Sequence, residues 1–288
     1  MSVYRNASQL PISRRVKACL GRLLRILSPG LAKRVREKPF SGGWGIAGKF
    51  LRNADLADAV GAGDHRGRQR YHQDFWSSTA AEADFYDRFG NRFEDLFLCY
   101  HAEIADRIAD VVAGWEKGAR VVEVGAGDGL VLAYLASRLP EFDSFIGIDL
   151  NPGQVAASIK AHAADSRLRF ETANIMDWLG KYPAPKSLLF TNGGVFEYLR
   201  RDELLSLFRE LKESGLPCAV ALTESVGLDH RFDTEFATYP YGLECALSHN
   251  YGAILRESGF VIRWERDSFT EAGEENHPTR WFQIVAEG

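Results

Sequence analysis

From Phe93 onward, short apolar stretches alternate with amphipathic stretches along the chain. The apolar stretches predict strands near 120–125, 145–149, 167–171, 187–191, 218–224, 260–266 and 280–286. The amphipathic stretches predict helices near 129–138, 153–164, 201–214 and 249–258, after a longer helix over Phe93–Trp115. Alternation of this kind is typical of an α/β fold, in which helices cover both faces of a mainly parallel sheet.

The N-terminal region has a different pattern, with apolar residues at every third or fourth position. From residue 12 to 27 these are Ile12, Val16, Cys19, Leu20, Leu23, Leu24 and Leu27. This spacing predicts an amphipathic helix, and its opposite face carries the basic residues Arg14, Lys17, Arg22 and Arg25. The sequence Ser28-Pro29-Gly30 is predicted to end that helix.

Charge separates this region from the rest of the chain. Residues 1–38, the basic arm, contain ten Lys or Arg residues and one acid, Glu37, for a net charge of +9. The remaining residues contain 25 basic and 38 acidic side chains, for a net charge of −13, which argues against a nucleic-acid partner. Three interpretations of the arm stay open. It packs on its own domain or on a second copy in a homodimer, it contacts a membrane surface peripherally through residues 12–27, or it is a targeting segment.

Cysteine usage and hydropathy bear on location. The four cysteines are scattered without metal-ligand spacing, which is typical of reduced thiols in a cytoplasmic protein. No apolar run approaches the ~20 residues that span a bilayer. We therefore expect a cytoplasmic protein, peripheral at the inner membrane face if the arm binds lipid.

Residues 39–91 include the aromatic pairs Phe75-Trp76 and Phe85-Tyr86 and are predicted to cap the substrate side of a main domain over 92–288.

The most informative chemistry lies in residues 121–129, Val-Val-Glu-Val-Gly-Ala-Gly-Asp-Gly. A β-branched strand is followed by glycines at alternate positions and then by helical content. Glycines at such a turn let backbone N–H groups approach a ligand closely, because no Cβ blocks the approach. The dinucleotide fingerprint needs G-x-G-x-x-G, whereas here the third glycine comes one residue early.

This stretch resembles motif I of the class I S-adenosylmethionine-dependent methyltransferases, acid-x-G-x-G-x-G, over Glu123 to Gly129. The resemblance covers about residues 92–288 and implies a Rossmann-like sheet of seven strands, mainly parallel, whose final strand inserts antiparallel; the basic arm would be an N-terminal helical extension. It also implies S-adenosylmethionine as cofactor. Glu123 would lie near its amino-acid end, and the loop of Gly125, Ala126, Gly127 and Gly129 would fold around its methionine portion.

Two further matches stand at the distances that the resemblance requires. Asp149 ends the second strand, where its carboxylate can accept hydrogen bonds from both ribose hydroxyls. The alternative is that Asp149 caps the next helix, although Asn151 can take that role. Asn174, after the third strand, would contact the adenine amino group or serve as a plain turn residue, and both interpretations stay open. Leu150, Ile175, which would flank the adenine ring, and Asn192, which ends the fourth strand, complete the predicted cofactor site.

Candidates for proton transfer follow the fourth and fifth strands. We predict that His249 acts as general base on a substrate hydroxyl, with His230 or Glu197 as alternatives. The competing interpretation makes Ser248 a helix cap and His249 a surface residue of the first turn. The stretch 248–251 loosely resembles bacterial methyltransferases of glycan and natural-product pathways.

The sequence thus predicts methyl transfer to a hydroxyl of a small molecule, sugar or glycan, without a metal. The Asn/Asp-Pro-Pro-aromatic signature of amino-group methyltransferases is absent. Two alternatives are an aminopropyltransferase-like enzyme and a non-catalytic module at a membrane surface. A nicotinamide dehydrogenase is disfavoured by the glycine spacing.

Overall fold

The structure is a computed structural model that describes residues 3–4, 9–40, 44–81, 91–115, 118–179, 186–270 and 278–288. The predicted aromatic pair Phe85-Tyr86 lies outside these ranges.

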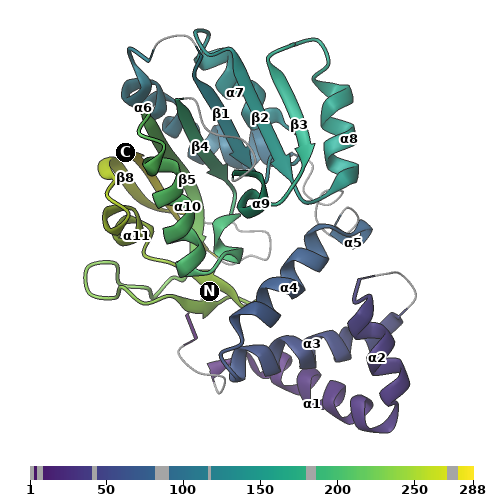
Figure 1. The fold of residues 1–288 in the computed structure, drawn as a ribbon. Helices are drawn as coiled ribbons and strands as arrows, with labels where there is room; N and C mark the ends of the chain where they lie inside the picture. The colour runs from purple at the N-terminus through teal and green to yellow at the C-terminus, as the bar shows by residue number, and fades with distance from the viewer. Residues whose placement is uncertain are drawn as a thin grey trace.

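All seven predicted strands are present and form one sheet (Figure 1). They are β1 (Arg120–Val124), β2 (Ser144–Asp149), β3 (Leu168–Thr172), β4 (Ser187–Asn192), β5 (Cys218–Val226), β8 (Val261–Thr270) and β9 (Thr279–Glu287). Their order is β3-β2-β1-β4-β5-β9-β8, and the first five are parallel. The last strand, β9, lies antiparallel between β5 and β8, which confirms the topology that the resemblance implied.

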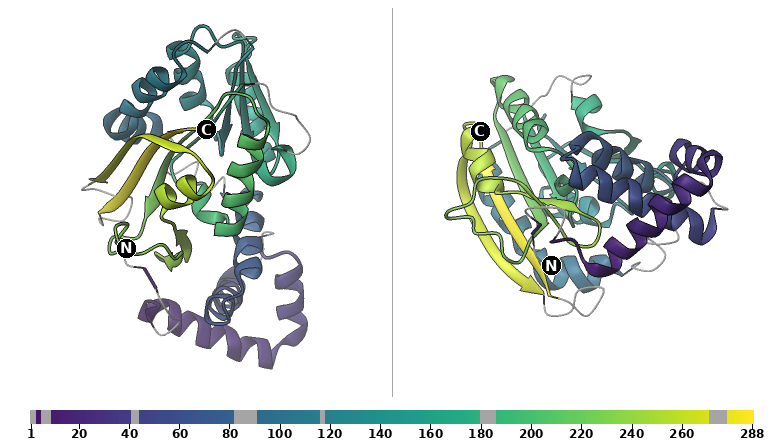
Figure 2. Two further views of the ribbon diagram at one scale, coloured as in Figure 1. Left: turned by 60° about the vertical axis from the view of Figure 1, so that its left-hand side comes forward. Right: turned by 90° about the horizontal axis from the view of Figure 1, so that it is seen from below.

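Alternating side chains of each strand build two cores. Val121 and the side chains on the same face of the neighbouring strands pack against η3 (Phe93–His101), α6 (Glu103–Val112), α7 (Leu130–Arg138) and α8 (Pro152–Ala161). Val122 and the side chains on the opposite face of the sheet pack against α9 (Ile175–Leu179), α10 (Arg201–Glu213) and α11 (Tyr251–Glu257). Because successive strand residues point to opposite faces, a strand buried on both sides reads as a continuous apolar run. Figure 2 shows helices on both sides of the sheet.

Several elements differ from the prediction. The helix predicted over Phe93–Trp115 is divided into the π-helical segment η3 and the α-helix α6. Four further helices, which the sequence did not predict, lie before η3. They are α2 (Pro29–Glu37), α3 (Gly45–Gly61), α4 (His65–Trp76) and α5 (Thr79–Ala81). Ser28-Pro29-Gly30 does end the first helix, but Pro29 also begins the next one, since proline is tolerated at the first helical position.

The first helix, α1 (Ile12–Leu27), has the predicted bounds and packs on α3. It does so through its small and basic side, not through its apolar side. Ala18 and Gly21 are buried there, and a Cβ on Gly21 would lie 2.1 Å from the Phe50 carbonyl oxygen. The guanidinium of Arg25 bonds Asp55 at 2.8 Å and Asp58 at 2.9 Å, both on α3. The helix therefore packs within its own chain, but six of its large apolar residues are exposed.

The helix α4 connects this lower helical layer, α1 to α3, to the sheet (Figure 1). Its Gln69 amide donates to the Glu203 carboxylate of α10 at 2.7 Å. The Asn151 amide, at the start of α8, donates to the carbonyl oxygens of Trp76 and Ser78. The predicted cap segment is thus attached to both sides of the main domain. A small hairpin of β6 (Tyr239–Tyr241) and β7 (Ala246–Ser248) lies within the insertion after β5.

Candidate active site

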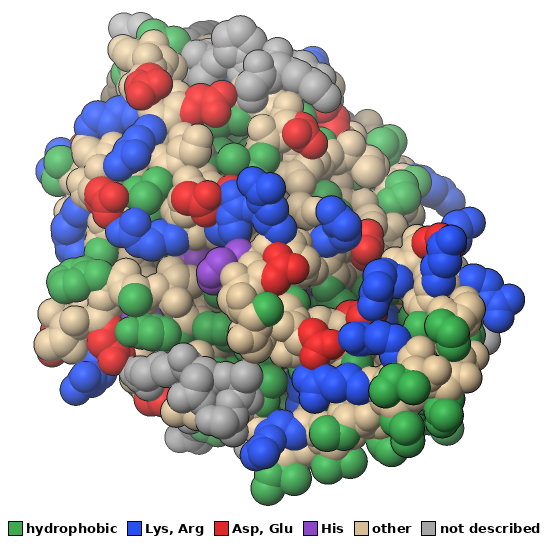
Figure 3. Space-filling view, turned by 60° about the horizontal axis from the view of Figure 1, so that its bottom comes forward, with side chains coloured by type: hydrophobic (Ala, Val, Ile, Leu, Met, Phe, Trp, Pro, Cys, Tyr) green, Lys and Arg blue, Asp and Glu red, His purple; other side chains and the backbone are tan. Residues whose placement is uncertain are grey.

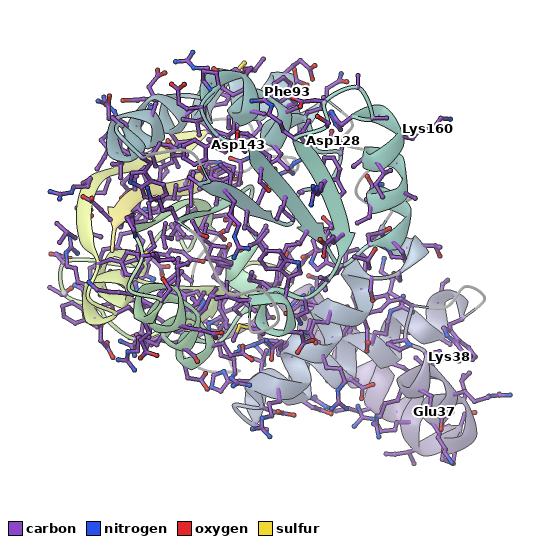
Figure 4. The ribbon with its side chains drawn as sticks, turned by 45° about the horizontal axis from the view of Figure 1, so that its top comes forward. Glu37, Lys38, Phe93, Asp128, Asp143 and Lys160 are labelled. Carbon is purple, nitrogen blue, oxygen red and sulfur yellow. The ribbon has the colours of Figure 1, made fainter. Side chains whose placement is uncertain are left out.

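A cleft of about 1510 Å³ opens at the carboxyl ends of the parallel strands. The loops after β1, β2, β3 and β4 form one wall, and the other walls come from α1, α3, α4, η3 and the β6–β7 hairpin. Figure 4 labels two residues of its lining, Phe93 of η3 and Asp128 of the glycine loop. The cleft therefore joins the predicted cofactor loop to the helical layer.

The glycine loop turns sharply where β1 ends. The backbone N–H groups of Gly125 and Ala126 both donate to the Ile148 carbonyl oxygen, at 2.7 and 3.1 Å. The φ angle of Gly125 is +73°, and a Cβ there would lie 2.6 Å from Val195. Only glycine fits that position without displacing a neighbour.

Asp149 secures the same loop from β2. One of its carboxylate oxygens accepts from the Gly127 N–H at 3.0 Å, and the other accepts from the Asn151 N–H at 2.8 Å. The cap of α8 is Asn151, whose side chain accepts from the N–H groups of Gly153 and Gln154. The capping interpretation of Asp149 is therefore wrong, and its buried carboxylate faces the cleft.

Glu123 is buried on β1 beneath the glycine loop. Burial, and then the charges of Asp128 and Asp149, raise the pKa of its carboxyl well above the usual range. Within the described residues, its Oε2 has no hydrogen-bond partner. A buried acceptor without a donor suits a cationic ligand group such as an ammonium, which would satisfy the acceptor and lower the pKa. The residues at this end of the cleft thus fit the amino-acid portion of S-adenosylmethionine.

Nine of the ten predicted cofactor residues line the cleft. They are Glu123, Gly125, Ala126, Gly127, Asp149, Leu150, Asn174, Ile175 and Asn192. The tenth, Gly129, is outside the lining, and a Cβ there would lie 2.6 Å from the Phe170 ring. Its φ of +77° shows that it serves the turn into α7. The side chain of Asn174 accepts from the Met176 N–H at 3.0 Å, so it shapes the turn and also borders the cleft.

Glu197 is the only one of the three predicted proton acceptors that lines the cleft within the described residues. It lies on η4 (Phe196–Tyr198), a 3₁₀ turn after β4. Its Oε2 accepts from the Ser225 hydroxyl at 2.8 Å and from the Tyr241 hydroxyl, and those two hydroxyls are 2.7 Å apart. Burial raises the pKa of Glu197 to about 8, although its bond with Tyr241 opposes the rise.

Glu224, on β5, holds the turn that carries Glu197. Its Oε2 accepts from the backbone N–H groups of Val195 and Phe196, at 2.9 and 3.0 Å, and its Oε1 accepts from the Thr191 hydroxyl. Burial raises the pKa of Glu224 to about 7. Because it bonds the backbone and does not line the cleft, Glu224 orients the 3₁₀ turn.

The two histidines occupy a different setting. His249 is fully buried, with Nε2 3.0 Å from the Leu199 carbonyl oxygen and Nδ1 2.9 Å from the Thr238 hydroxyl. Burial lowers its pKa to about 3, so the ring is neutral, and both nitrogens are engaged. Nδ1 of His230 lies 2.8 Å from the Ser248 hydroxyl, also outside the cleft lining. This geometry favours structural roles.

The competing interpretation of 248–251 is also corrected. Ser248 belongs to β7, and α11 is capped by Asn250, whose side chain accepts from the Ala253 N–H. His249 is buried and not a surface residue of the first turn.

Replacing His249 with Ala should lower stability and leave methyl transfer intact. Removing the ring leaves the Leu199 carbonyl without its donor, which costs about 1–3 kcal/mol of unfolding free energy. Urea unfolding measures this loss, and steady-state kinetics measures kcat. A large fall in kcat with normal stability would instead support His249 as the base.

Sequence reasoning missed Ser225, Tyr241 and the positioning role of Glu224. The only available signal was the density of polar and aromatic residues after the fifth strand. Their sequence separations from Glu197 are 28, 44 and 27 residues, so no local pattern joins them.

Comparisons with known proteins agree with this fold. Residues 121–215 match the family model of a methyltransferase domain. No curated protein sequence matches the chain significantly. A solved S-adenosylmethionine-dependent methyltransferase from Leishmania major is 12% identical, with a TM-score of 0.50 over 82% of this chain and 90% of that one.

Two further solved structures are similar at lower scores. Magnesium protoporphyrin IX methyltransferase from Synechocystis is 17% identical, with a TM-score of 0.48 over 76% of this chain and 96% of that one. The N-methyltransferase NodS from Bradyrhizobium japonicum is 14% identical, with a TM-score of 0.45 over 68% of this chain and 90% of that one.

Residues 121–215 therefore form a methyltransferase domain, and the seven-stranded sheet has the order that the resemblance to the class I S-adenosylmethionine-dependent methyltransferases implied. The predicted fold class, enzyme class and cofactor are confirmed.

Proposed function

We propose that this methyltransferase acts on a hydroxyl group of a small molecule, sugar or glycan, with Glu197 as the general base. The observation that carries the proposal is the Glu197 carboxyl itself. It lies in the wall of the cleft, two hydroxyl groups orient it, and its pKa is about 8.

A carboxyl of this kind suits a hydroxyl acceptor. When bound, S-adenosylmethionine supplies an electrophilic methyl group on a sulfonium. A hydroxyl oxygen attacks such a carbon slowly unless its proton is removed, whereas the nitrogen of a neutral amine is nucleophilic enough to attack before it loses a proton. A base is most effective when its pKa lies near the working pH. The carboxylate of Glu197 would take the proton of the acceptor hydroxyl. The hydroxyl groups of Ser225 and Tyr241 would hold that carboxylate in place.

The cofactor roles are part of the proposal. Glu123 would accept from the ammonium group of the methionine end, and the glycine loop would follow the methionine portion. The Asp149 carboxylate, which borders the cleft at the end of β2, would accept from the ribose hydroxyls. Asn174 and Ile175 would border the adenine, and Leu150 and Asn192 would complete the wall.

The helical layer offers a distinct acceptor side. The aromatic residues that line this side include Phe40, between α2 and α3, and Tyr71, Phe75 and Trp76 of α4. The cations that line it include Arg14 and Lys17 of α1 and Lys49 and Arg52 of α3. Among the described residues of α1 and α3, no acid lines the cleft. Aromatic faces pack against sugar or other ring systems, and clustered cations bind carboxylate or phosphate. We infer that the acceptor combines a ring with an anionic group.

Isotope labelling tests the proposed reaction. The enzyme is incubated with cell extract and S-adenosylmethionine that carries a deuterated methyl group, and labelled products are characterised by mass spectrometry. A methyl ether on an anionic compound is expected. A label on nitrogen or carbon would contradict the hydroxyl acceptor, and aminopropyl products formed from decarboxylated cofactor would support the alternative enzyme class.

A further inference from the structure

The apolar side of α1 is uncovered. Of the large hydrophobic residues that are exposed in the described part of the chain, six lie on this one helix. They are Ile12, Val16, Leu20, Leu23, Ile26 and Leu27. Ile12 and Ile26 are 76% and 77% exposed, so the whole length of the helix contributes. Figure 3 shows a row of hydrophobic side chains at the lower right of the molecule, with Lys and Arg side chains beside it.

This arrangement reverses that of an ordinary surface helix, which buries its apolar stripe against the core. Here the inward side is occupied by Ala18 and Gly21, and the ion pairs of Arg25 with Asp55 and Asp58 hold it on α3. The apolar stripe, defined as the six residues above, is therefore presented outward by a rigid attachment. A contiguous exposed patch of this kind marks an interaction surface.

We propose that the apolar stripe docks on an anionic membrane surface, with α1 lying in the plane of the interface. The positive charge of this region complements the negative charge of such a membrane. Residues 12–37, which form α1 and α2, carry eight Lys or Arg residues and one acid, Glu37. Arg15, Lys33 and Arg34 are exposed, and no ion pair of Arg15 or Arg34 exists within the described residues. An interfacial helix combines these two properties, since apolar side chains enter the headgroup region and cations attract anionic lipid.

A second copy of the chain fits this surface less well. Two copies that met through their stripes would bring two strongly basic regions together, and like charges at close range repel. No helix in the described part of the chain is both long and apolar enough to cross a membrane. The proposed contact is therefore one on the surface of the bilayer.

Docking would bring the acceptor side of the cleft to within about one helix diameter, roughly 10 Å, of the membrane. Arg14 and Lys17 of α1 line the cleft, so the cationic edge of the cleft and the stripe belong to the same helix. An amphiphilic acceptor with an anionic headgroup could then enter from the bilayer. This consequence rests on the proposed function, whereas the docking does not, so vesicle binding and methyl transfer are measured separately.

Vesicle sedimentation tests the docking with the full chain. Binding is expected to vesicles of phosphatidylglycerol mixed with phosphatidylcholine, and to fall as salt is raised. The double variant Leu23→Asn/Ile26→Asn should bind at least about tenfold more weakly. The matched control is Ile159→Asn/Leu216→Asn, which alters two exposed apolar residues outside α1 and should bind like the wild type. Because all four residues are exposed, melting temperatures should stay unchanged.

Three results would overturn the proposal. The wild type could fail to bind anionic vesicles, or the stripe variant could bind as tightly as the wild type. A wild-type dimer in light scattering that the stripe variant dissociates, without vesicle binding, would show that a second copy covers the stripe. Failure of methyl transfer to a hydroxyl would contradict the proposed function and would leave vesicle binding unaffected.

Discussion

Replacing Glu197 with Gln should lower kcat for methyl transfer by about 10²–10⁴-fold, the range typical of a lost general base. The amide has nearly the shape of the carboxyl and can still bond Ser225 and Tyr241, but it cannot take a proton. Binding of S-adenosylhomocysteine should therefore be nearly unchanged. Steady-state kinetics with the acceptor that isotope labelling identifies measures the first quantity, and calorimetry measures the second.

The pH dependence gives an independent sign. The wild-type kcat/KM should rise with pH and level off above about pH 8, because the base must be ionised and its pKa is about 8. The Glu197→Gln variant should show a flat kcat/KM profile over that range.

The free energy of unfolding of the wild type should change in the opposite direction and fall as pH rises. The folded-state pKa is raised, so the stabilising contribution is full below the unfolded-state pKa and is lost as pH rises toward 8. The variant should lack that loss.

Glu141→Gln is a suitable control, because Glu141 is exposed and outside the cleft lining. It should match the wild type in both kcat and pH profile. A Glu197→Gln variant with wild-type kcat would remove Glu197 from the mechanism.

Replacing Asp149 with Asn should weaken binding of S-adenosylhomocysteine by about 10- to 100-fold. Hydrogen bonds to a charged group contribute about 1.5–3 kcal/mol, and each 1.4 kcal/mol is a factor of ten in Kd. The amide also places a donor against one of the two backbone N–H groups that the carboxylate now accepts. Calorimetry measures the change in Kd.

Asp143→Asn supplies the matched control for Asp149. Asp143 precedes β2, at the opposite end of that strand from Asp149, and is labelled in Figure 4. Its carboxylate accepts from the Gly118 N–H at 3.3 Å, remote from the cleft lining. Wild-type affinity is expected for this control. If Asp149→Asn also retained wild-type affinity, the proposed ribose contact would be wrong.

Local patterns predicted the strands and the first helix because their signals lie within a few residues. The bounds of α1 match the apolar spacing of residues 12–27, and the strands match the apolar runs. The helices α3 and α4 were missed because glycines and polar residues weaken their apolar periodicity. The π-helical form of η3 has no local signal, since α- and π-helical turns accept similar residues.

The same distinction applies to the site. The glycine loop and Asp149 stand at the ends of neighbouring parallel strands, so the fold alone brings them together. The sequence favoured His249 over Glu197 as the general base, yet His249 is enclosed in the core and Glu197 reaches the cleft. Burial depends on which segments pack over a side chain, and those segments are distant in sequence.

The amino-acid sequence was sufficient to predict the strands, the glycine loop and the amphipathic character of α1, because each depends on residues close together in the chain. The tertiary structure decided three other properties. Glu197 is hydrogen-bonded to Ser225 and Tyr241, His249 is buried away from the cleft, and the apolar side of α1 is exposed. Each of these follows from packing between distant segments, where small residues and ion pairs determine which face of an element is covered.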